Sequence, residues 1–467
     1  MDLSGLIKDL EGLPVETEAS VLRRKSRDYF WYSPVLKRLL QDVMGDLVVC
    51  PRDETEVVRV LRACHAHRVP VTPRGAGTGN YGQAMPLSGG VVLDLHRMDG
   101  IASTSGSRVV AGPGAVVAAV DAALHKAAGQ ALRIAPSTAA TATVGGFVAG
   151  GSGGLGSVCW GGLRAAGNVL GARVVTCEAE PRVLELRGDD VMKVIHAYGT
   201  TGVVTELELA TTEAHDWVDV LIALEHWTDA ARLAQQFAES DGLLLNELAF
   251  FAAPLPYDAF TAFQPAFRRE QSLVVLMAAP SALEAVQAMA RRAGGEVVYR
   301  ADQVSPEVRA RLPPVAELGW NHTTLRALQL DRRITYLQTR YPDLPALERV
   351  RARLGDELPM HVELMRSNGM PSMGGLPLVR FTTEQRLQEI MQIHEDEGCA
   401  VFNPHVYTLE EGGWRRPDPL LLDFKRQADP LGLLNPGKMV AWERPDFDFG
   451  SGRSFVFPGL RGVEAAA

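Results

Sequence analysis

The fold is decided by the stretch Val69-Pro70-Val71-Thr72-Pro73-Arg74-Gly75-Ala76-Gly77-Thr78-Gly79-Asn80-Tyr81-Gly82. Its first part is an apolar run typical of a β-strand, and glycine occupies four of its last eight positions. Because glycine carries no side chain, the backbone N–H groups of such a loop can converge on an anion. The stretch is therefore predicted to be a strand followed by a loop that holds a diphosphate.

Two familiar nucleotide-binding sequence patterns occur in the chain, but the residues around each pattern exclude the corresponding binding site. Residues 77–82 fit G-x-G-x-x-G, but the residues after them lead to a strand-like run over 91–95, whereas a dinucleotide fingerprint requires a helix there. Residues 432–438 fit G-x-x-x-x-G-K, but Met439 replaces the magnesium-binding Ser or Thr, and Pro436 removes an amide donor. Neither a Rossmann site nor a P-loop is predicted.

The composition is that of a globular, acidic chain. Its 467 residues are 46% hydrophobic and 22% charged, and this length predicts two or more domains. The net charge of −9 argues against nucleic acid as a partner, because binding to a phosphate backbone needs a clustered excess of Lys and Arg. The N-terminus has no apolar signal region and no run is long enough for a membrane span, so a cytoplasmic protein is expected. The five cysteines are scattered without C-x-x-C spacing, which predicts buried thiols rather than a disulfide framework or a metal site.

A second glycine-rich segment, Ser137 to Gly156, has seven glycines within its last twelve residues. Glycine loses much conformational freedom on folding, and a fold keeps it where something lies against bare backbone. Apolar residues interleaved with these glycines, including Val144 and Phe147, argue against a flexible linker. A ligand or another strand is therefore expected against this segment.

Patterns along the chain predict three parts and an α+β fold. Residues 1–212 start with a helical lead-in up to about residue 45, include a helix over 54–67 capped by Asp53, and continue as an α/β unit. Residues 213–418 contain two β-α-β modules, which indicate an antiparallel ferredoxin-like sheet covered by helices, and then a third set of elements. Residues 419–467 are too short for a domain and are expected to pack back on the first part.

Five landmarks in this order resemble the vanillyl-alcohol oxidase/PCMH flavoprotein superfamily. They are Pro73 to Gly79, Pro136 to Thr138 with Thr143 to Gly146, Val169 to Val175, Gly199 to Glu206, and Asp429 to Lys438. The resemblance is nearest to the branch of glycolate oxidase FAD-subunits and D-lactate dehydrogenases. It implies a PCMH-type FAD-binding domain from about residue 38 to 212, joined by the C-terminal segment, with a substrate domain between them.

The resemblance also implies FAD contacts in the two glycine-rich segments and near the C-terminus. By position these are Pro73, Arg74, Gly75, Ala76, Gly77, Thr78, Gly79, Asn80, Gln83, Pro136, Ser137, Thr138, Thr143, Gly145, Gly146, Gly150, Gly153, Val203 and Asn435. For Arg74 the alternative is a salt bridge that braces the loop. Relatives with histidyl-FAD carry the histidine where this chain has Thr78, so non-covalent FAD is expected, with His405 as an alternative attachment point.

The predicted catalytic base is His405, because flavin oxidation needs a proton acceptor and the pKa of histidine lies near working pH. Asn403 and Tyr407 share its parity along an expected strand over 400–407 and would face the same pocket. The alternative is a solvent-facing strand with ordinary polar residues.

Two further groups are weaker candidates for the substrate site. His322 and Arg326 lie close in sequence, and Arg326 is either a ligand for a carboxylate or phenolate or an ordinary surface arginine at a helix start. Glu363, with His361 on the same strand face, is a third choice. The chain lacks the His-x-Gly-Asp-Gly-Asn and Gly-Glu-His-Gly strings of the nearest branch, so no metal is predicted and a 2-hydroxy acid substrate stays open.

The leading functional prediction is an FAD-linked oxidase or dehydrogenase that transfers a hydride from the CH–OH group of a small substrate to flavin N5. A para-substituted phenol oxidase of the vanillyl-alcohol or 4-cresol type is one alternative. An FAD-binding electron-transfer subunit of a larger complex is another. The electron acceptor, oxygen or a redox partner, and a possible homodimer are left open by the sequence.

Overall fold

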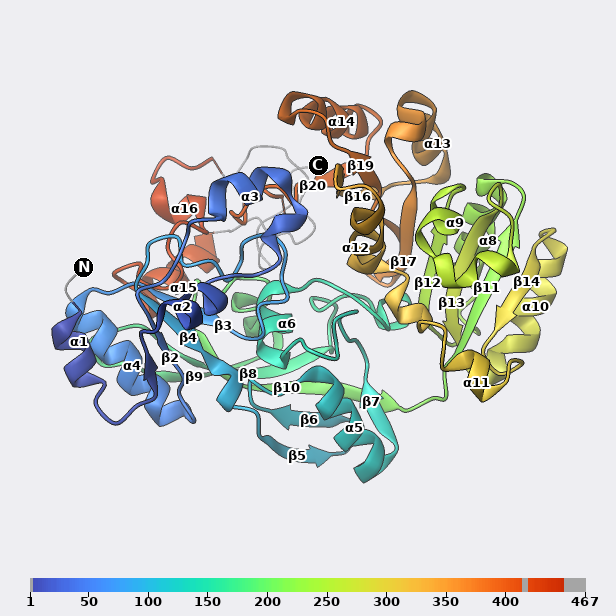
Figure 1. Cartoon of the computed structure of the whole chain (residues 1–467). Coiled ribbons are helices and arrows are strands. Elements are labelled where there is room, and N and C mark those ends of the chain that lie inside the picture. Colours follow the sequence, from blue (N-terminus) through green and yellow to red (C-terminus); the bar gives the residue numbers. More distant parts are fainter. Residues whose placement is uncertain (1–2, 414–418, 449–467) are drawn as a thin grey trace. The chain divides into compact units, whose positions relative to one another are not determined.

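The computed structural model describes residues 3–413 and 419–448 (Figure 1). The chain divides into two compact units, and each is assembled from stretches that are separate in the sequence. Unit 1 contains residues 3–152, 166–213 and, within the described chain, 403–413 and 419–448. Unit 2 contains residues 153–165 and 214–402. Among the described residues no helix is both long and apolar enough to cross a bilayer.

The first sheet of unit 1 has four strands in the order β1-β2-β4-β3. Its strands are β1 (Val15–Glu16), β2 (Leu47–Val49), β3 (Val71–Arg74) and β4 (Val91–Asp94), and the last three run parallel. The helices before and between them are α1 (Ser4–Asp9), α2 (Ala19–Lys25), α3 (Pro34–Leu40) and α4 (Glu54–His67). α4 begins as predicted, because the Asp53 carboxylate accepts a hydrogen bond from the Glu56 N–H at 2.9 Å. Its buried side, with Val57 and Leu61, packs into the same core as the strands.

The second sheet of unit 1 is antiparallel and has six strands. They are β5 (Ile101–Ser105), β6 (Arg108–Ala111), β7 (Gln130–Leu132), β8 (Val169–Val175), β9 (Val183–Arg187) and β10 (Val203–Glu213). Two helices of this unit lie between β6 and β8 in the sequence, α5 (Val117–Ala128) and α6 (Val144–Gly150). The second glycine-rich segment thus contains a short helix, α6, rather than only extended chain.

The C-terminal segment adds α15 (Pro419–Ala428) and α16 (Val440–Glu443) to unit 1. Between these helices the chain lies beside β3. The Val71 N–H donates to the Leu433 carbonyl and the Asn435 N–H donates to the Val71 carbonyl, both at 2.8 Å. This isolated parallel bridge anchors the C-terminal segment at the strand that leads into the glycine loop.

Unit 2 consists of two β-α-β-β-α-β modules of the ferredoxin-like type. The first module is β11 (Val218–Leu224), α8 (Trp227–Glu239), β12 (Leu245–Phe251), β13 (Ser272–Ala278), α10 (Leu283–Arg292) and β14 (Glu296–Arg300). The second is β16 (Gln338–Tyr341), α13 (Leu344–Leu354), β17 (His361–Ser367), β18 (Met370–Gly375), α14 (Glu384–Asp396) and β20 (Ala400–Phe402). Each module arranges its four strands in the same order, and the two join through β12 and β17 into one antiparallel eight-stranded sheet (Figure 1).

The α+β class and the ferredoxin-like sheet are therefore confirmed, and the sheet turns out to be a doubled one. Shorter elements complete unit 2: α7 (Ser157–Trp160), α9 (Leu255–Ala259), α11 (Pro306–Arg309), α12 (Trp320–Leu330), β15 (Ile334–Tyr336) and β19 (Leu378–Arg380). The predicted strand over 400–407 is wrong in its second half, because β20 ends at Phe402 and residues 404–405 form a turn.

Candidate functional site

The glycine loop after β3 lies directly against the start of α6. A Cβ atom on Gly75 would stand 2.2 Å from the Thr143 Oγ1 and 3.3 Å from the backbone of Gly146, which leaves no room for any side chain. Thr143 caps α6, since its hydroxyl accepts a hydrogen bond from the Gly146 N–H at 3.2 Å. Two predicted FAD-binding segments that lie far apart in the sequence thus meet through bare backbone.

Gln83 and Asn435 tie this arrangement together. The Gln83 side-chain amide donates to the Gly150 carbonyl, at the end of α6, over 2.9 Å. Asn435 Nδ2 donates to the carbonyls of Gln83 and Tyr198 at 2.8 and 2.7 Å. Asn435 is 1% exposed, and its Oδ1 has no hydrogen-bond partner among the described residues. This orphaned acceptor is an atom that a bound cofactor would satisfy.

Arg74 braces the loop, but through carbonyl groups rather than a salt bridge. Its guanidinium donates to the Arg27 carbonyl at 2.6 Å and to the Ala76 carbonyl at 3.2 Å, and burial lowers its pKa from the ordinary value. Its buried Nε has no hydrogen-bond partner within residues 3–413 and 419–448. The cramped glycines and these orphaned polar atoms fit a polyanionic cofactor such as FAD.

The remaining predicted cofactor contacts are spread over both units. Pro136 and Thr138 lie in a turn before α6, where their carbonyls accept from the N–H groups of Ala139 and Thr141. The side chain of Val203, at the start of β10, is fully buried in the apolar core, so only its backbone is available to a ligand. Gly153 belongs to unit 2, whereas the other predicted contacts belong to unit 1.

His405 lies in a turn of unit 1 and does not share a strand face with its predicted neighbours. Its N–H donates to Asn403 Oδ1 at 2.9 Å, and its Nδ1 lies 2.7 Å from the hydroxyl of Ser33, the residue that caps α3. Tyr407 packs against the cluster that contains Leu40, and the Lys438 ammonium lies 5.1 Å from its ring centroid. The expectation that His405, Asn403 and Tyr407 line one strand face is wrong, because no strand forms there.

His322 and Arg326 lie on α12 in unit 2. The Arg326 Nε donates to the Glu317 carbonyl at 3.0 Å, and its guanidinium is 3.6 Å from the Glu317 carboxylate. These contacts are those of a helix-bracing arginine. His322 and Arg326 belong to unit 2, as does Glu363, whereas His405 belongs to unit 1.

Unit 2 also contains a buried carboxyl pair of which the sequence prediction identified only one member. Glu247 on β12 and Glu363 on β17 are 2% and 1% exposed, on the paired strands that join the two modules. Trp320 binds both: its backbone N–H donates to Glu363 at 2.6 Å, and its indole N–H donates to Glu247 at 3.1 Å. A Cβ on Gly319 would stand 2.8 Å from an oxygen of each carboxyl group. An acid in the mostly apolar strand 245–251 was the available signal for Glu247.

The electrostatics of this pair favour protonation. Burial raises the pKa of Glu363 to about 7 and the pKa of Glu247 well above its ordinary value, and repulsion from Glu363 raises the latter further. His361 lies 2.7 Å from Glu363, and burial lowers the pKa of its imidazole to about 3. Near neutral pH the pair therefore retains a shared proton beside a neutral imidazole.

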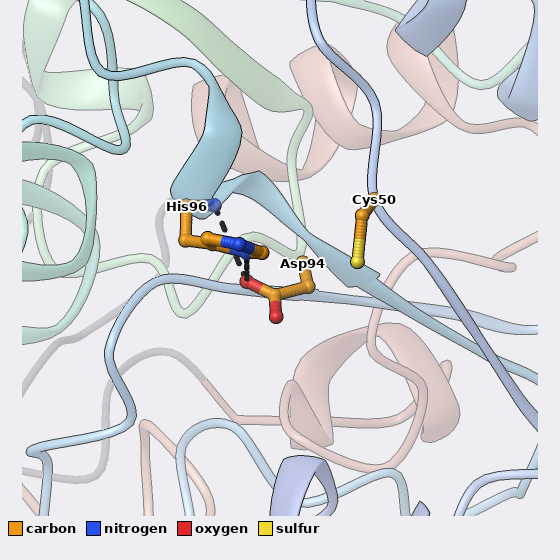
Figure 2. Close-up of side chains that lie close together, drawn as sticks. All are labelled: Cys50, Asp94 and His96. Carbon is orange, nitrogen blue, oxygen red and sulfur yellow. Dashed lines mark hydrogen bonds and ion pairs between the residues drawn. The ribbon is translucent and has the colours of Figure 1, made fainter. Parts of the chain in front are cut away.

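Figure 2 shows one further group with metal-ligand chemistry, Cys50, Asp94 and His96. The three ligand atoms lie within 4.8 Å of one another, and His96 Nδ1 is 3.0 Å from the Asp94 carboxylate. The Lys25 ammonium, however, already pairs with the other oxygen of Asp94, and burial raises the pKa of the Cys50 thiol to about 11. A cation would have to displace Lys25 and deprotonate this thiol, so the group is an ion pair beside a protonated cysteine.

Comparisons with known proteins agree with the geometry of unit 1. Residues 45–185 match the family model described as FAD binding domain. Glycolate oxidase subunit GlcD of Bacillus subtilis is 30% identical over 197 residues, which are 40% of this chain and 41% of that protein. D-lactate dehydrogenase of Anaerostipes hadrus is 31% identical over 196 residues, 39% of this chain and 40% of that protein. The alignments thus span about two fifths of these relatives.

The similarity of the fold extends much further than that of the sequence. A solved structure of alkyldihydroxyacetonephosphate synthase has a TM-score of 0.72 and covers 94% of this chain and 85% of its own, at 16% identity. At that identity the likeness concerns the fold alone. The chain therefore carries an FAD-binding domain at residues 45–185, as its glycine-rich landmarks predict.

Proposed function

We propose that this chain is an FAD-dependent oxidoreductase that takes a hydride from the CH–OH carbon of a small 2-hydroxy acid or alcohol. The observation that supports this most is the FAD-binding domain, whose relatives are named for glycolate and D-lactate, both 2-hydroxy acids. FAD, when bound, supplies the hydride acceptor. The chain itself has to bind the cofactor, orient the substrate and accept the hydroxyl proton.

In this proposal the amides of residues 75–79 bind the diphosphate, and Gln83 and Asn435 hold the loop against α6. The orphaned Arg74 Nε and Asn435 Oδ1 are further polar atoms for the cofactor. The cofactor is bound non-covalently, because Thr78 offers no imidazole for attachment.

Two groups are proposed as the acceptor of the hydroxyl proton. His405 has an imidazole oriented by the Ser33 hydroxyl. Glu363 is a buried carboxyl whose pKa of about 7 suits a base near neutral pH. Asn403, Tyr407, His322 and Arg326 remain proposed pocket residues, with Arg326 as the ligand for a substrate carboxylate.

The proposal is tested by anaerobic mixing of the oxidised protein with 2-hydroxy acids, primary alcohols and para-alkyl phenols while flavin absorbance is recorded. A 2-hydroxy acid or an alcohol is expected to bleach the flavin. Bleaching by phenols alone would instead identify the para-substituted phenol oxidase, and no bleaching by any of them would overturn the proposal.

The same assay separates the two proposed bases. The variant that removes the base, His405→Ala or Glu363→Gln, should slow bleaching by about 100-fold or more, whereas the other variant should retain most of the rate. Equal, small effects of both substitutions would remove both residues from this role. Glu284→Gln on the exposed side of α10 is the matched control for Glu363→Gln.

A second candidate function is an FAD-binding electron-transfer subunit, because the Bacillus subtilis relative is named a subunit. In that case the flavin of this chain would be reduced only in the presence of a partner protein. When air is admitted to the same preparation after bleaching, the flavin absorbance shows whether oxygen or a redox partner is the electron acceptor. A homodimer would be recognised by the mass of the protein in solution.

A further inference from the structure

The buried carboxyl pair of unit 2 is not symmetric, because one oxygen of Glu363 lies next to two donors. The Trp320 backbone N–H donates to Glu363 Oε1 at 2.6 Å, and His361 Nε2 lies 2.7 Å from the same oxygen. Burial lowers the pKa of this imidazole to about 3, so the ring is neutral and can donate from Nε2. Donors that converge on a carboxyl oxygen favour its ionised form, here that of Glu363.

Glu247 has the opposite surroundings. The Trp320 indole N–H donates to its Oε2 at 3.1 Å, whereas its Oε1 is buried and has no hydrogen-bond partner within the described residues. A Cβ on Gly319 would stand 2.8 Å from Glu247 Oε1 and from Glu363 Oε1, so both oxygens face Gly319. A buried anionic oxygen without a donor is costly, whereas a protonated oxygen can itself donate to Glu363. The geometry therefore favours a proton on Glu247 Oε1.

The titration of the two carboxyl groups agrees with this placement. Burial raises both pKa values, and the hydrogen bond between the two groups then raises the pKa of Glu247 and lowers that of Glu363. At about pH 8 Glu363, whose pKa is about 7, is mostly ionised, while Glu247 keeps its proton. The pair thus consists of one carboxylic acid and one carboxylate.

The elements packed around the pair leave this distribution undisturbed. His361 on β17 is the titratable group that contacts the pair in the described part of the chain, and it is neutral. Cys159 on α7 donates its thiol to the Leu245 carbonyl at 3.0 Å, and burial raises its pKa, so it carries no charge. On α12 the Arg326 guanidinium is bound at Glu317.

Trp320 connects the pair to the second glycine-rich segment. It begins α12 with a left-handed backbone (φ 50°), which is unusual for a bulky residue and stores strain. In this conformation its backbone N–H binds Glu363 while its indole N–H binds Glu247. A Cβ on Gly153 would stand 3.5 Å from Trp320 Cη2. The carboxyl pair therefore lies one side chain away from a residue that is predicted to contact FAD.

We propose that Glu247 is a positioning residue of the proposed oxidation, on which this inference rests. Its carboxyl group holds the proton of the pair and donates it as a hydrogen bond to Glu363 Oε1. Glu363 consequently stays a carboxylate and can accept the proton of the substrate hydroxyl. The hydrogen bonds from Trp320 and His361 both end at Oε1, so the structure assigns Glu363 Oε2 to the substrate proton.

The bonds of this step balance as follows from the chemistry of a CH–OH group. The C–H bond breaks and its electron pair leaves with the hydrogen as a hydride, for which bound FAD is the acceptor. The O–H bond breaks and its proton passes to Glu363, while the carbon–oxygen single bond becomes a C=O bond. The carboxyl pair then holds two protons in place of one.

Infrared spectroscopy of the oxidised, FAD-loaded protein at about pH 8 locates the proton without any substrate. We expect the C=O stretching band of a buried, protonated carboxyl group in the natural protein and in Glu363→Gln, and its loss in Glu247→Gln. Difference spectra between the natural protein and each variant remove the bands that they share. A band that is lost in Glu363→Gln but kept in Glu247→Gln would place the proton on Glu363 and overturn the proposal.

The pH dependence of anaerobic flavin reduction tests the role of Glu247 in the reaction. In the natural protein the rate should rise with pH through about 7, as Glu363 loses its proton. Glu247→Leu removes the donor to Glu363, so the midpoint should move upward by about one pH unit and reduction at about pH 6 should slow about tenfold. Glu247→Gln supplies an amide donor and should bring the midpoint back close to that of the natural protein.

The two proposals fail in different ways. A midpoint that Glu247→Leu leaves unchanged overturns this inference alone, whereas a flavin that no 2-hydroxy acid or alcohol reduces overturns the proposed function as well. Should Glu247→Leu not fold, the infrared comparison of the two Gln variants still decides where the proton lies. Glu284→Gln, exposed on α10, is the control and should change neither the band nor the midpoint.

Discussion

Gly75 has almost no room for a side chain in the proposed cofactor site. A Cβ there would stand 2.2 Å from Thr143 Oγ1, so Gly75→Ala must push the loop away from α6. We expect this variant to bind FAD about tenfold or more weakly, measured by titration of the apoprotein. Gly100→Ala is the control, because nothing lies within 4 Å of its Cβ position. Full FAD affinity in the Gly75 variant would contradict the assigned cradle.

The Glu247–Glu363 pair predicts how stability depends on pH. Both pKa values are raised in the folded protein, so the fold binds protons that the unfolded chain releases, and the free energy of unfolding decreases as pH rises through about 5 to 7. Glu247→Gln removes one titrating group and offers Glu363 an amide donor. At about pH 8 the variant should therefore be more stable than the natural protein, by on the order of 1–2 kcal/mol.

Thermal unfolding at about pH 5 and pH 8 measures this effect. Glu284→Gln, exposed on α10, serves as the control and should leave both midpoints unchanged. The account of the pair fails if Glu247→Gln destabilises the protein as much at the higher pH as at the lower one.

Single residues were the hardest feature to predict from the sequence. The glycines at 75, 77 and 79 could be recognised in the sequence, because each glycine costs conformational entropy on folding and such a cluster therefore indicates a functional loop. Glu247 does not, because its importance depends on Glu363, more than a hundred residues later, reaching the neighbouring strand. The residue that lies opposite on a neighbouring strand cannot be predicted until the pairing register of the two strands is known.

At the level of elements, the C-terminal segment matters because it closes the glycine loop. Asn435 has a left-handed backbone (φ 42°) and satisfies the buried carbonyls of Gln83 and Tyr198. Asn435→Ala leaves both acceptors without this donor and should lower the free energy of unfolding by about 1–3 kcal/mol per group, together with FAD affinity. Thermal unfolding and flavin content measure the two effects.

Asn368→Ala is the matched control for this substitution. Asn368 also has a left-handed backbone (φ 51°), but it is exposed in the turn between β17 and β18. It therefore reports the cost of backbone strain without the lost hydrogen bonds. Equal losses in both variants would assign the effect to strain alone.

Elements with strong periodicity were predicted well, and those governed by local polar contacts were not. α4 has a capping aspartate and an apolar stripe, so its bounds follow from the sequence. The strand expected over 400–407 stops at Phe402 because the Asn403 side chain accepts the His405 N–H and forms a turn instead. The doubled module of unit 2 escaped prediction because its two copies share topology rather than sequence motifs.

For the molecule as a whole, the mode of cofactor attachment is the first property to test. With Thr78 at the position where histidyl-FAD relatives carry histidine, FAD should dissociate when the protein is denatured. After acid precipitation the yellow colour should be found in the supernatant. Colour that stays in the pellet would point to a covalent bond and make His405 the residue to examine.

The central claim is that the FAD-binding chain takes a hydride from the carbon that bears the substrate hydroxyl. The most direct measurement is the anaerobic rate of flavin reduction by a 2-hydroxy acid that carries either hydrogen or deuterium at C2. The account predicts reduction by the unlabelled acid and a several-fold slower rate with deuterium, because the C2–H bond breaks in that step. Reduction at the same rate with both isotopes, or none with any 2-hydroxy acid or alcohol, would contradict it.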